Sequence, residues 1–330
     1  MNRPARLLLL ALLASCAHAP PPPPVEARAW PPPPARPRVE FAGSFPGGDA
    51  PARTAPMWKR LLDFVVGLDP AKDDAPLLQR PFGIAAAAGG FLVADPDRRA
   101  VLRVHLPEGT IEPVECAALP WKMPLAVAGG PDGSLYVADG GAGRVVRIGP
   151  DGACAAIGAG RLERPSGAAF AEGRIYVADP PRHEVVAFSP DGAEALHFGA
   201  GQLHFPTSIA AAPDQSLMVV DALHFRIVRF RPDGSVAGTF GEAGDGGGAF
   251  GRPKCVAVDG AGRTYVSDAQ NDVVIVFSKE HAFELALGGS QPAPGSLTLP
   301  AGVAVGGDVL YVADTWNHRV QMFRLLPEAP

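Results

Sequence analysis

Six copies of one short phrase, repeated at nearly even spacing, predict an all-β fold: a six-bladed β-propeller with four-stranded antiparallel blades. Each copy is a short apolar run that ends in aspartate. The aspartates are Asp95, Asp139, Asp179, Asp221, Asp268 and Asp314. Subtracting consecutive aspartate numbers gives 44, 40, 42, 47 and 46 residues. A period of about 40–45 residues built from short strands indicates a propeller with one blade per repeat.

Two further features recur in register with the aspartates. A β-branched residue follows each aspartate by six positions, as in the third strand of a blade. A proline precedes each aspartate and opens a strand of small apolar residues. These prolines mark the predicted blade starts: Pro81, Pro124, Pro165, Pro206, Pro253 and Pro300. Pro-Asp-Gly turns, such as Pro150 to Gly152, join neighbouring strands, because proline presets φ and glycine accepts a positive φ.

The last repeat contains the triplet Asn317-His318-Arg319, and here the sequence resembles the NHL-repeat family, which is named for such a triplet. The resemblance covers about residues 80–325. It implies an interaction scaffold, since propellers of this type mainly bind other molecules. Some six-bladed relatives are instead metal-dependent lyases and lactonases with the metal in the central channel.

The last blade has three visible strands before the chain ends, so its fourth strand must come from elsewhere. Residues 38–45 have the character of a fourth strand, and we expect them to close the ring as the outer strand of this blade. Trp58, Leu61, Leu62, Val65 and Val66 then form the stripe of an amphipathic helix. This helix is expected at about 56–67, on the loop-bearing face, which carries the loops between second and third strands.

The N-terminus predicts export. Residues 1–15 combine a basic start with a short apolar run, which is a secretory signal too short for a stable transmembrane helix. The sequence Leu-Ala-Ser-Cys ending at Cys16 resembles a bacterial lipoprotein signal, which implies lipid on Cys16. Ala17 is not aspartate, which by the same resemblance favours the outer membrane. Residues 16–37 are expected to be a proline-rich tether, and residues 38–330 the propeller.

The other three cysteines do not predict a disulfide framework. Cys116 and Cys154 are expected on the fourth strands of neighbouring blades, whose outer edges diverge. A disulfide needs Cα atoms within about 7 Å, so we expect none between them. Cys255 opens an inner strand and is expected to be a small buried apolar residue.

Charge and composition narrow the function classes. The formal net charge of −5 gives no basis for nucleic-acid binding, so we expect no nucleic-acid partner. The expected partners are an envelope protein, a peptide or a glycan, with the membrane contacted through lipid on Cys16. We expect the chain to act as a monomer.

The six blade aspartates are expected to be structural. Each follows a strand and precedes a tight loop, where a carboxylate can accept backbone N–H bonds. Catalysis seldom needs six equivalent carboxylates, so sites should be sought where the repeats differ.

The position before the blade-opening proline differs in an ordered way. It holds Arg80, Arg164 and Arg252 on blades one, three and five, and apolar residues on the other three. If these arginines face the channel, they form a ring of guanidinium groups suited to an anion, reinforced by Lys254 and Lys122. If they lie on the rim, they pair with neighbouring acids. Trp316 on the same face is either a packing aromatic or part of a partner surface with Phe82.

Histidines are the other candidates. His183, His204 and His224 could converge on one face of adjacent blades and hold a divalent metal, but no zinc-type spacing connects them. Scattered surface histidines are the alternative. We expect no cofactor, while a divalent cation in the channel stays open. No nucleophile elbow or paired-carboxylate pattern is present, and catalytic residues are not assigned.

Two hypotheses follow. The first is an envelope-anchored, non-enzymatic binding propeller that presents one face to a protein, peptide or glycan. The second is a channel-site metal-dependent lyase or lactonase-like hydrolase. The inner strands are small and apolar, as in Gly83 to Ala86, and offer no set of metal ligands. This departure from the metal-dependent relatives favours the binding hypothesis.

Overall fold

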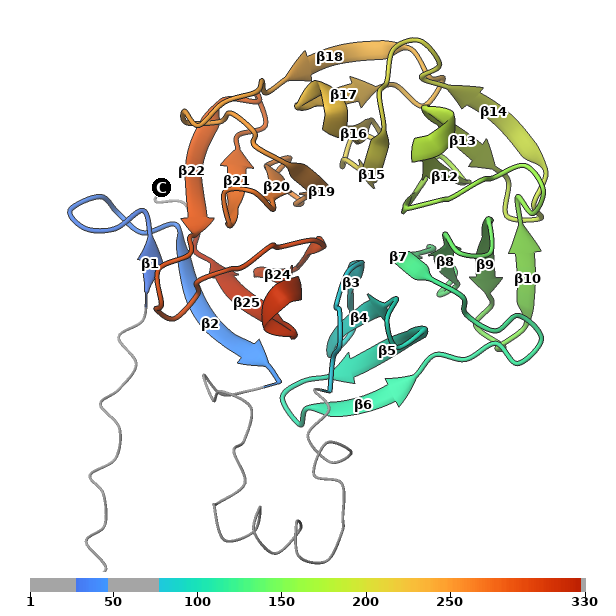
Figure 1. The fold of residues 1–330 in the computed structure, drawn as a ribbon, viewed down its shortest axis with the longest axis horizontal. Helices are drawn as coiled ribbons and strands as arrows, with labels where there is room; N and C mark the ends of the chain where they lie inside the picture. The colour runs from blue at the N-terminus through green and yellow to red at the C-terminus, as the bar shows by residue number, and fades with distance from the viewer. Residues whose placement is uncertain (1–27, 47–76, 328–330) are drawn as a thin grey trace, which may run out of the picture.

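The computed structural model describes residues 28–46 and 77–327. Within them, six antiparallel sheets stand side by side around a central channel (Figure 1). Five of the sheets have four strands, and in each of these a strand pairs with the next one along the chain. The fold is therefore a six-bladed β-propeller, as the repeats predict.

Blades one to five each run from an inner strand at the channel to an outer strand at the edge. Blade one contains β3 (Ile84–Ala87), β4 (Gly90–Asp95), β5 (Ala100–His105) and β6 (Thr110–Pro113). Blade two contains β7 (Pro124–Gly129), β8 (Leu135–Asp139), β9 (Arg144–Ile148) and β10 (Cys154–Ile157). Blade three contains β11 (Gly167–Ala171), β12 (Arg174–Asp179), β13 (Glu184–Phe188) and β14 (Glu194–Phe198). Blade four contains β15 (Pro206–Ala211), β16 (Leu217–Asp221), β17 (Arg226–Phe230) and β18 (Val236–Phe240). Blade five contains β19 (Pro253–Val258), β20 (Thr264–Asp268), β21 (Val273–Phe277) and β22 (Phe283–Gly288).

Blade six joins the two ends of the chain. It contains β23 (Val303–Gly306), β24 (Val309–Asp314), β25 (Arg319–Leu325), β2 (Val39–Phe45) and β1 (Ala29–Trp30). β2 pairs antiparallel with β25, from Val39 opposite Leu325 to Phe45 opposite Val320. The prediction that residues near 38–45 close the ring is confirmed. β1 adds a fifth strand on the outside, where the Trp30 ring lies 5.5 Å from that of Phe323.

The core lies between the blades rather than within one layer. The second strand of each blade is almost wholly buried, and its apolar residues pack against the neighbouring blade. For example, Tyr176 of blade three packs in one cluster with Val219 of blade four. Each fully buried side chain of this kind contributes about 1.5–3 kcal/mol through removal of apolar surface from water.

The loops at the ends of the strands follow the predicted turn chemistry. At Pro150-Asp151-Gly152, the Asp151 carboxylate accepts the N–H of Ala153 at 3.0 Å, and Gly152 has a φ of +79°. Three blades carry a short 3-10 helix directly after the aspartate: η2 (Pro180–Arg182), η3 (Ala222–His224) and η4 (Thr315–Asn317). In the described part of the chain, no helix has the length and apolar character needed to cross a bilayer. The helix predicted at about 56–67 lies outside the described residues.

The prediction for Cys116 and Cys154 was wrong, because these residues form a disulfide with a Cα–Cα distance of 6.2 Å. β6 ends at Pro113, so Cys116 belongs to the segment that crosses from blade one to blade two. This segment packs on the outside of blade two, with Cys116 buried against Val146 and Ile148. The crossing brings Cys116 to the outer strand β10, so the divergence of the two blade edges does not separate the sulfurs.

Candidate ligand site at the channel mouth

The six blade aspartates hold the chain where it enters each inner strand. All six side chains have no exposed surface. Asp268 accepts the backbone N–H of Gly251 at 2.6 Å and of Arg252 at 2.9 Å. Equivalent bonds run from Gln79 and Arg80 to Asp95, from Lys122 and Met123 to Asp139, from Glu163 and Arg164 to Asp179, from His204 to Asp221, and from Thr298 to Asp314. Each carboxylate therefore fixes the start of an inner strand at the loop-bearing face.

This anchoring places one equivalent residue of every blade at the channel mouth, directly after the blade-opening proline. The six mouth residues are Phe82, Leu125, Ser166, Thr207, Lys254 and Ala301, and all of them line one cavity. The two positions that follow in each blade line the same cavity more deeply. Its volume is about 70 Å³. A water needs about 10–15 Å³ on this measure, so the cavity has room for roughly five waters or a small chemical group.

The deeper wall consists of small residues because the inner strands approach one another closely. A Cβ on Gly83 would lie 2.3 Å from the carbonyl oxygen of Leu125, and one on Gly302 would lie 2.1 Å from that of Phe82. Real Cβ atoms do not approach this closely, so glycine is required at both positions. The close approach limits the cavity to the mouth and its first two layers.

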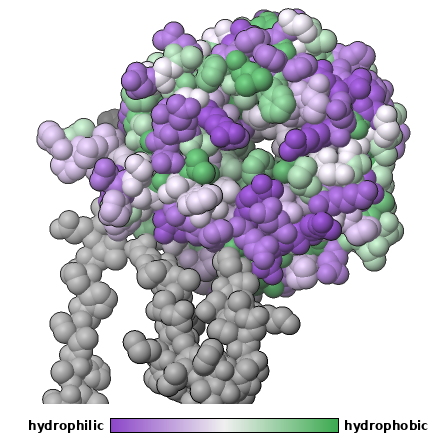
Figure 2. All heavy atoms as spheres, viewed as in Figure 1, coloured by the Kyte–Doolittle hydropathy of each residue, from purple (hydrophilic) through white to green (hydrophobic). Residues whose placement is uncertain are grey.

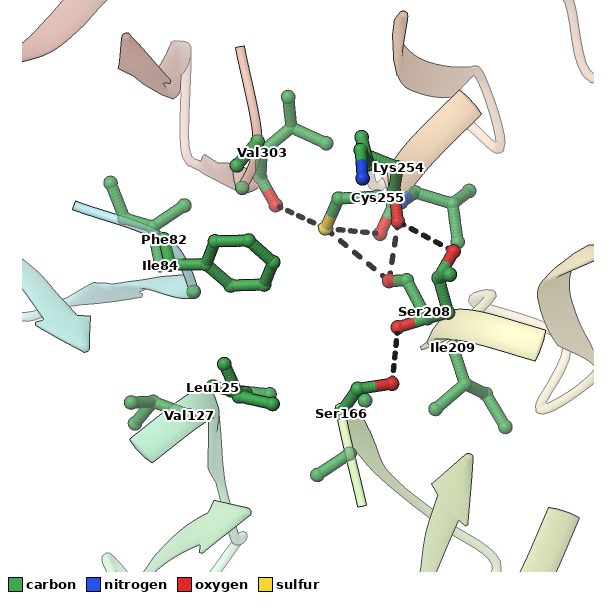
Figure 3. A pocket seen from close by; sticks show the side chains of 18 residues that line it. Phe82, Ile84, Leu125, Val127, Ser166, Ser208, Ile209, Lys254, Cys255 and Val303 are labelled. Atoms are coloured by element: carbon green, nitrogen blue, oxygen red, sulfur yellow. Dashed lines mark hydrogen bonds between the residues drawn. The ribbon is translucent and has the colours of Figure 1, made fainter. Parts of the chain in front are cut away.

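The cavity has two unlike halves (Figure 3). Phe82, Ile84, Leu125 and Val127 of blades one and two form an apolar half, in which the ring of Phe82 points into the channel. The polar side chains of the lining come from blades three to five and are Ser166, Thr207, Ser208, Lys254 and Cys255. Figure 3 shows Ser166, Ser208, Lys254 and Cys255 on the side opposite the apolar half, with Ile209 among them; this side is called the polar half. An amphipathic ligand group could therefore be oriented by this cavity.

The hydroxyl groups of the polar half already donate their protons. Ser166 Oγ donates to the carbonyl of Thr207 at 2.9 Å, and Thr207 Oγ1 donates to the carbonyl of Lys254 at 2.9 Å. A hydroxyl has one proton and two lone pairs. Towards a ligand, Ser166 and Thr207 can therefore act only as hydrogen-bond acceptors.

Lys254 is the charged residue among those that line the cavity. Burial, reinforced by the positive charge of nearby Arg252, lowers the pKa of its ammonium group. Nothing in residues 28–46 or 77–327 gives this ammonium a hydrogen bond or an ion pair.

Its neighbour Cys255 has a pKa raised by burial, so the thiol stays neutral and accepts a hydrogen bond from Ser208 Oγ at 3.3 Å. Cys255 was expected to be a small buried apolar residue, but it lines the cavity and forms a hydrogen bond with Ser208.

The arginines proposed as a ring lie outside the cavity lining. Arg80 pairs with Asp97 of its own blade at 3.0 Å, and the side chains of Arg164 and Arg252 are exposed. Trp316 lies in η4 and is 66% exposed. Figure 2 shows hydrophilic residues over much of this face and hydrophobic ones close to the channel mouth.

The structure does bring three of the histidines together. The rings of His183 and His204 lie 5.1 Å apart, and those of His204 and His224 lie 5.4 Å apart. His183 Nδ1 accepts the N–H of Phe205, and His224 Nδ1 bonds the Asp221 carboxylate at 2.8 Å. Across the described ranges, no group of three or more His, Cys, Asp or Glu residues is arranged to hold a metal ion. The three rings are in tilted contact and bridge blades three and four.

Most of the mouth residues were missed from the sequence. Lys254 was considered only as support for the arginines, and Phe82 only as part of an aromatic surface. A usable signal existed, because the residue after each blade-opening proline changes from apolar to polar to charged around the ring. The prediction of an arginine ring uses the position before the proline, which lies outside the cavity lining.

Comparisons with known proteins agree with the fold. A family model for the NHL repeat matches residues 297–323, which span most of blade six. No curated protein matches the chain in sequence. Many solved structures are similar in shape, and three illustrate the range.

The first of these is an auxiliary nutrient binding protein from Bacteroides thetaiotaomicron, with a TM-score of 0.62 and 11% identity over 77% of this chain and 71% of that one. The second is a catalytically inactive virginiamycin B lyase from Staphylococcus aureus with quinupristin, with a TM-score of 0.58 and 15% identity over 74% and 80% of the two chains. The third is a gluconolactonase from Xanthomonas campestris, with a TM-score of 0.59 and 20% identity over 76% and 89%. At these identities the likeness shows a shared propeller fold.

Proposed function

We propose that this chain is an exported, envelope-anchored binding propeller without enzymatic activity, whose channel mouth holds part of a peptide partner. The observation that carries this proposal is the divided mouth. One repeated position supplies six side chains, which form an apolar half around Phe82 and a polar half around Lys254. A rigid ring of this kind can orient a ligand at little cost in conformational entropy.

The chemistry of the lining supports binding over catalysis. The residues that line the cavity include no histidine, aspartate or glutamate, so a channel metal of the kind used by lyases and lactonases would lack ligands there. The proposed binding needs no cofactor. Among the similar structures, the nutrient binding protein gives a precedent for binding on this fold, while the lyase and the gluconolactonase give the enzymatic alternative.

The apolar half favours a peptide over a glycan. Phe82, Leu125 and Ile84 offer aliphatic and aromatic surface that an apolar side chain can cover. A glycan would place hydroxyl groups against this surface and would leave some of them without partners.

The proposal of export rests on the leader sequence and on the disulfide. Residues 1–15 form a secretory signal, and Cys16 is proposed to carry the lipid that anchors the chain, in the outer membrane of a bacterial envelope. The bond between Cys116 and Cys154 agrees with an oxidising compartment. Incorporation of radiolabelled palmitate into the wild-type chain, with none in Cys16→Ser, is the expected result. Equal labelling of both would refute the anchor.

Binding is tested with the full-length chain and a synthetic hexapeptide library. Phe82→Asp places a carboxylate in the apolar half of the mouth and should abolish peptide binding. Phe283→Asp is the matched control, because Phe283 is 44% exposed on the outer strand of blade five. Peptides that bind the wild type and the control but not Phe82→Asp support the proposal. Equal binding by all three proteins would show that the mouth does not take part in peptide binding. Hydrolysis of gluconolactone or cleavage of quinupristin by the wild type would contradict the proposal that the chain has no enzymatic activity.

A further inference from the structure

The cavity at the channel mouth presents a mismatched set of hydrogen-bonding groups. Lys254 brings an ammonium that no described residue pairs, and Lys has three donor hydrogens and no acceptor. Ser166 and Thr207 bring oxygens whose protons are already given to backbone carbonyls. The site therefore favours a ligand that has both a negatively charged acceptor for Lys254 and a hydrogen-bond donor for Ser166 or Thr207.

A carboxylate next to an amide N–H meets both requirements in one small unit. The carboxylate pairs with the Lys254 ammonium, and the N–H donates to Ser166 or Thr207. Inorganic phosphate can pair with the ammonium and can donate a P–OH proton, but it has no apolar atoms to cover the side chains around Phe82. A neutral amide can accept a hydrogen bond from the ammonium but supplies no negative charge to balance it, so the charged group loses water without gaining an ion pair.

The apolar half sets the third property of the ligand. Phe82, Ile84 and Leu125 face Lys254 across the cavity, so a group bonded to the lysine directs its remaining atoms onto these side chains (Figure 3). The space of about 70 Å³ admits only a few ligand atoms beside the carboxylate. A chain terminus is the part of a peptide that can place so small a group in the cavity.

We propose that the channel mouth binds the carboxylate end of an N-acylated apolar amino acid, with Lys254 holding the carboxylate and the Ser166 and Thr207 oxygens accepting the adjacent N–H. This proposal rests on the proposed binding function and names the ligand class. The same chemistry occurs at the C-terminus of a peptide and in a free N-acyl amino acid. Lys254 is partly buried, which lowers the pKa of its ammonium group, and a bound carboxylate would raise this pKa again.

The five lysines of the chain allow a direct test by NMR of the full-length protein carrying 13C-dimethylated lysines. Loss of one resonance in Lys254→Arg assigns Lys254, and Lys279 serves as an exposed internal control. The probes are N-acetyl-leucine, N-acetyl-leucinamide, the peptide acetyl-Ala-Ala-Leu with a free or an amidated C-terminus, and inorganic phosphate.

The expected result is that the free carboxylates shift the Lys254 resonance and raise its titration midpoint, while the amides and phosphate do not. The Lys279 resonance should stay in place. Lys254→Met should weaken binding of the free carboxylates by about tenfold to a hundredfold, as for loss of a hydrogen bond between charged groups. A response to N-acetyl-leucine alone would identify a small acid as the source, and a response to the tripeptide alone would identify a peptide terminus.

Three outcomes would overturn the proposal. These are a Lys254 resonance that no probe moves, an equal response to free and amidated ends, and an equal response to phosphate. The proposed function fails separately. Suppose that hexapeptides bind the wild type but not Phe82→Asp, and that amidating their C-terminus does not weaken binding. This result would support a binding site at the mouth and would contradict recognition of the carboxylate.

Discussion

Replacing Asp268 by alanine tests whether the blade aspartates anchor the channel mouth. The substitution removes the acceptor for the N–H groups of Gly251 and Arg252, which lie 2.6 and 2.9 Å from the carboxylate oxygens. It also removes the longer bonds from Gln270 and Asn271. A donor left without a partner costs about 1–3 kcal/mol, so the two shortest bonds alone give a loss of about 2–6 kcal/mol. The free energy of unfolding, measured by urea denaturation of the full chain, should fall by this amount.

The design includes a matched control and a clear refutation. Asp151→Ala removes an aspartate from an exposed turn, where water replaces the single bond to Ala153, so the loss should stay below about 1 kcal/mol. Asp268→Asn keeps the size of the side chain and should fall between the two. An Asp268→Ala chain within about 0.5 kcal/mol of the wild type would refute the anchoring argument, because that is the range of an ordinary surface substitution.

Three further predictions concern other parts of the fold. Gly302→Ala places a Cβ within 2.1 Å of the Phe82 carbonyl oxygen, so the free energy of unfolding in urea should fall by about 1–3 kcal/mol. An unchanged urea midpoint of unfolding would contradict the close approach of the strands. Replacing both Cys116 and Cys154 by serine opens a loop with a sequence separation of 38 and should cost about 4 kcal/mol; a melting temperature insensitive to reductant would contradict this. Burial lowers the pKa of His281 from 6.5, so the unfolded chain binds more protons between the two pKa values and stability should rise with pH there. His281→Phe should flatten this part of the profile, and parallel profiles for the two chains would count against it.

Much of the fold could be predicted from the sequence because its determinants are local and repeated. The strand that ends in each aspartate, the proline that opens each blade and the Pro-Asp-Gly turns all act within a few residues. The closing strand at residues 38–45 was predictable for a different reason. A blade that lacks its outer strand leaves an unpaired edge, and one suitable segment remained.

The disulfide and the mouth were harder to predict because they depend on how the chain leaves regular structure. Cys116 reaches Cys154 through an irregular crossing whose course the repeat pattern does not specify. Side chains alternate between the two faces of a strand only while the backbone stays extended, and at the mouth this alternation stops at the proline that opens the strand. Phe205 and Leu299 precede their prolines with φ values of +70° and +48°, which break the extended path. In these two blades the change of direction turns the residue before the proline away from the channel. In all six blades the residue after the proline lines the channel, and the residue before it does not.

The closure of blade six has a consequence for biogenesis. Among the described strands of the propeller, β2 precedes blades one to five in the chain and its partner β25 follows them. Until the chain has been synthesised as far as Leu325, the backbone N–H and C=O groups of β2 lack their partner strand and can pair with another chain. Under the export proposed above, the chain would pass through this state outside the cytoplasm. Closure of the ring should therefore wait for the synthesis of β25, and nascent chains that stop before blade six should be substrates for chaperones and proteases.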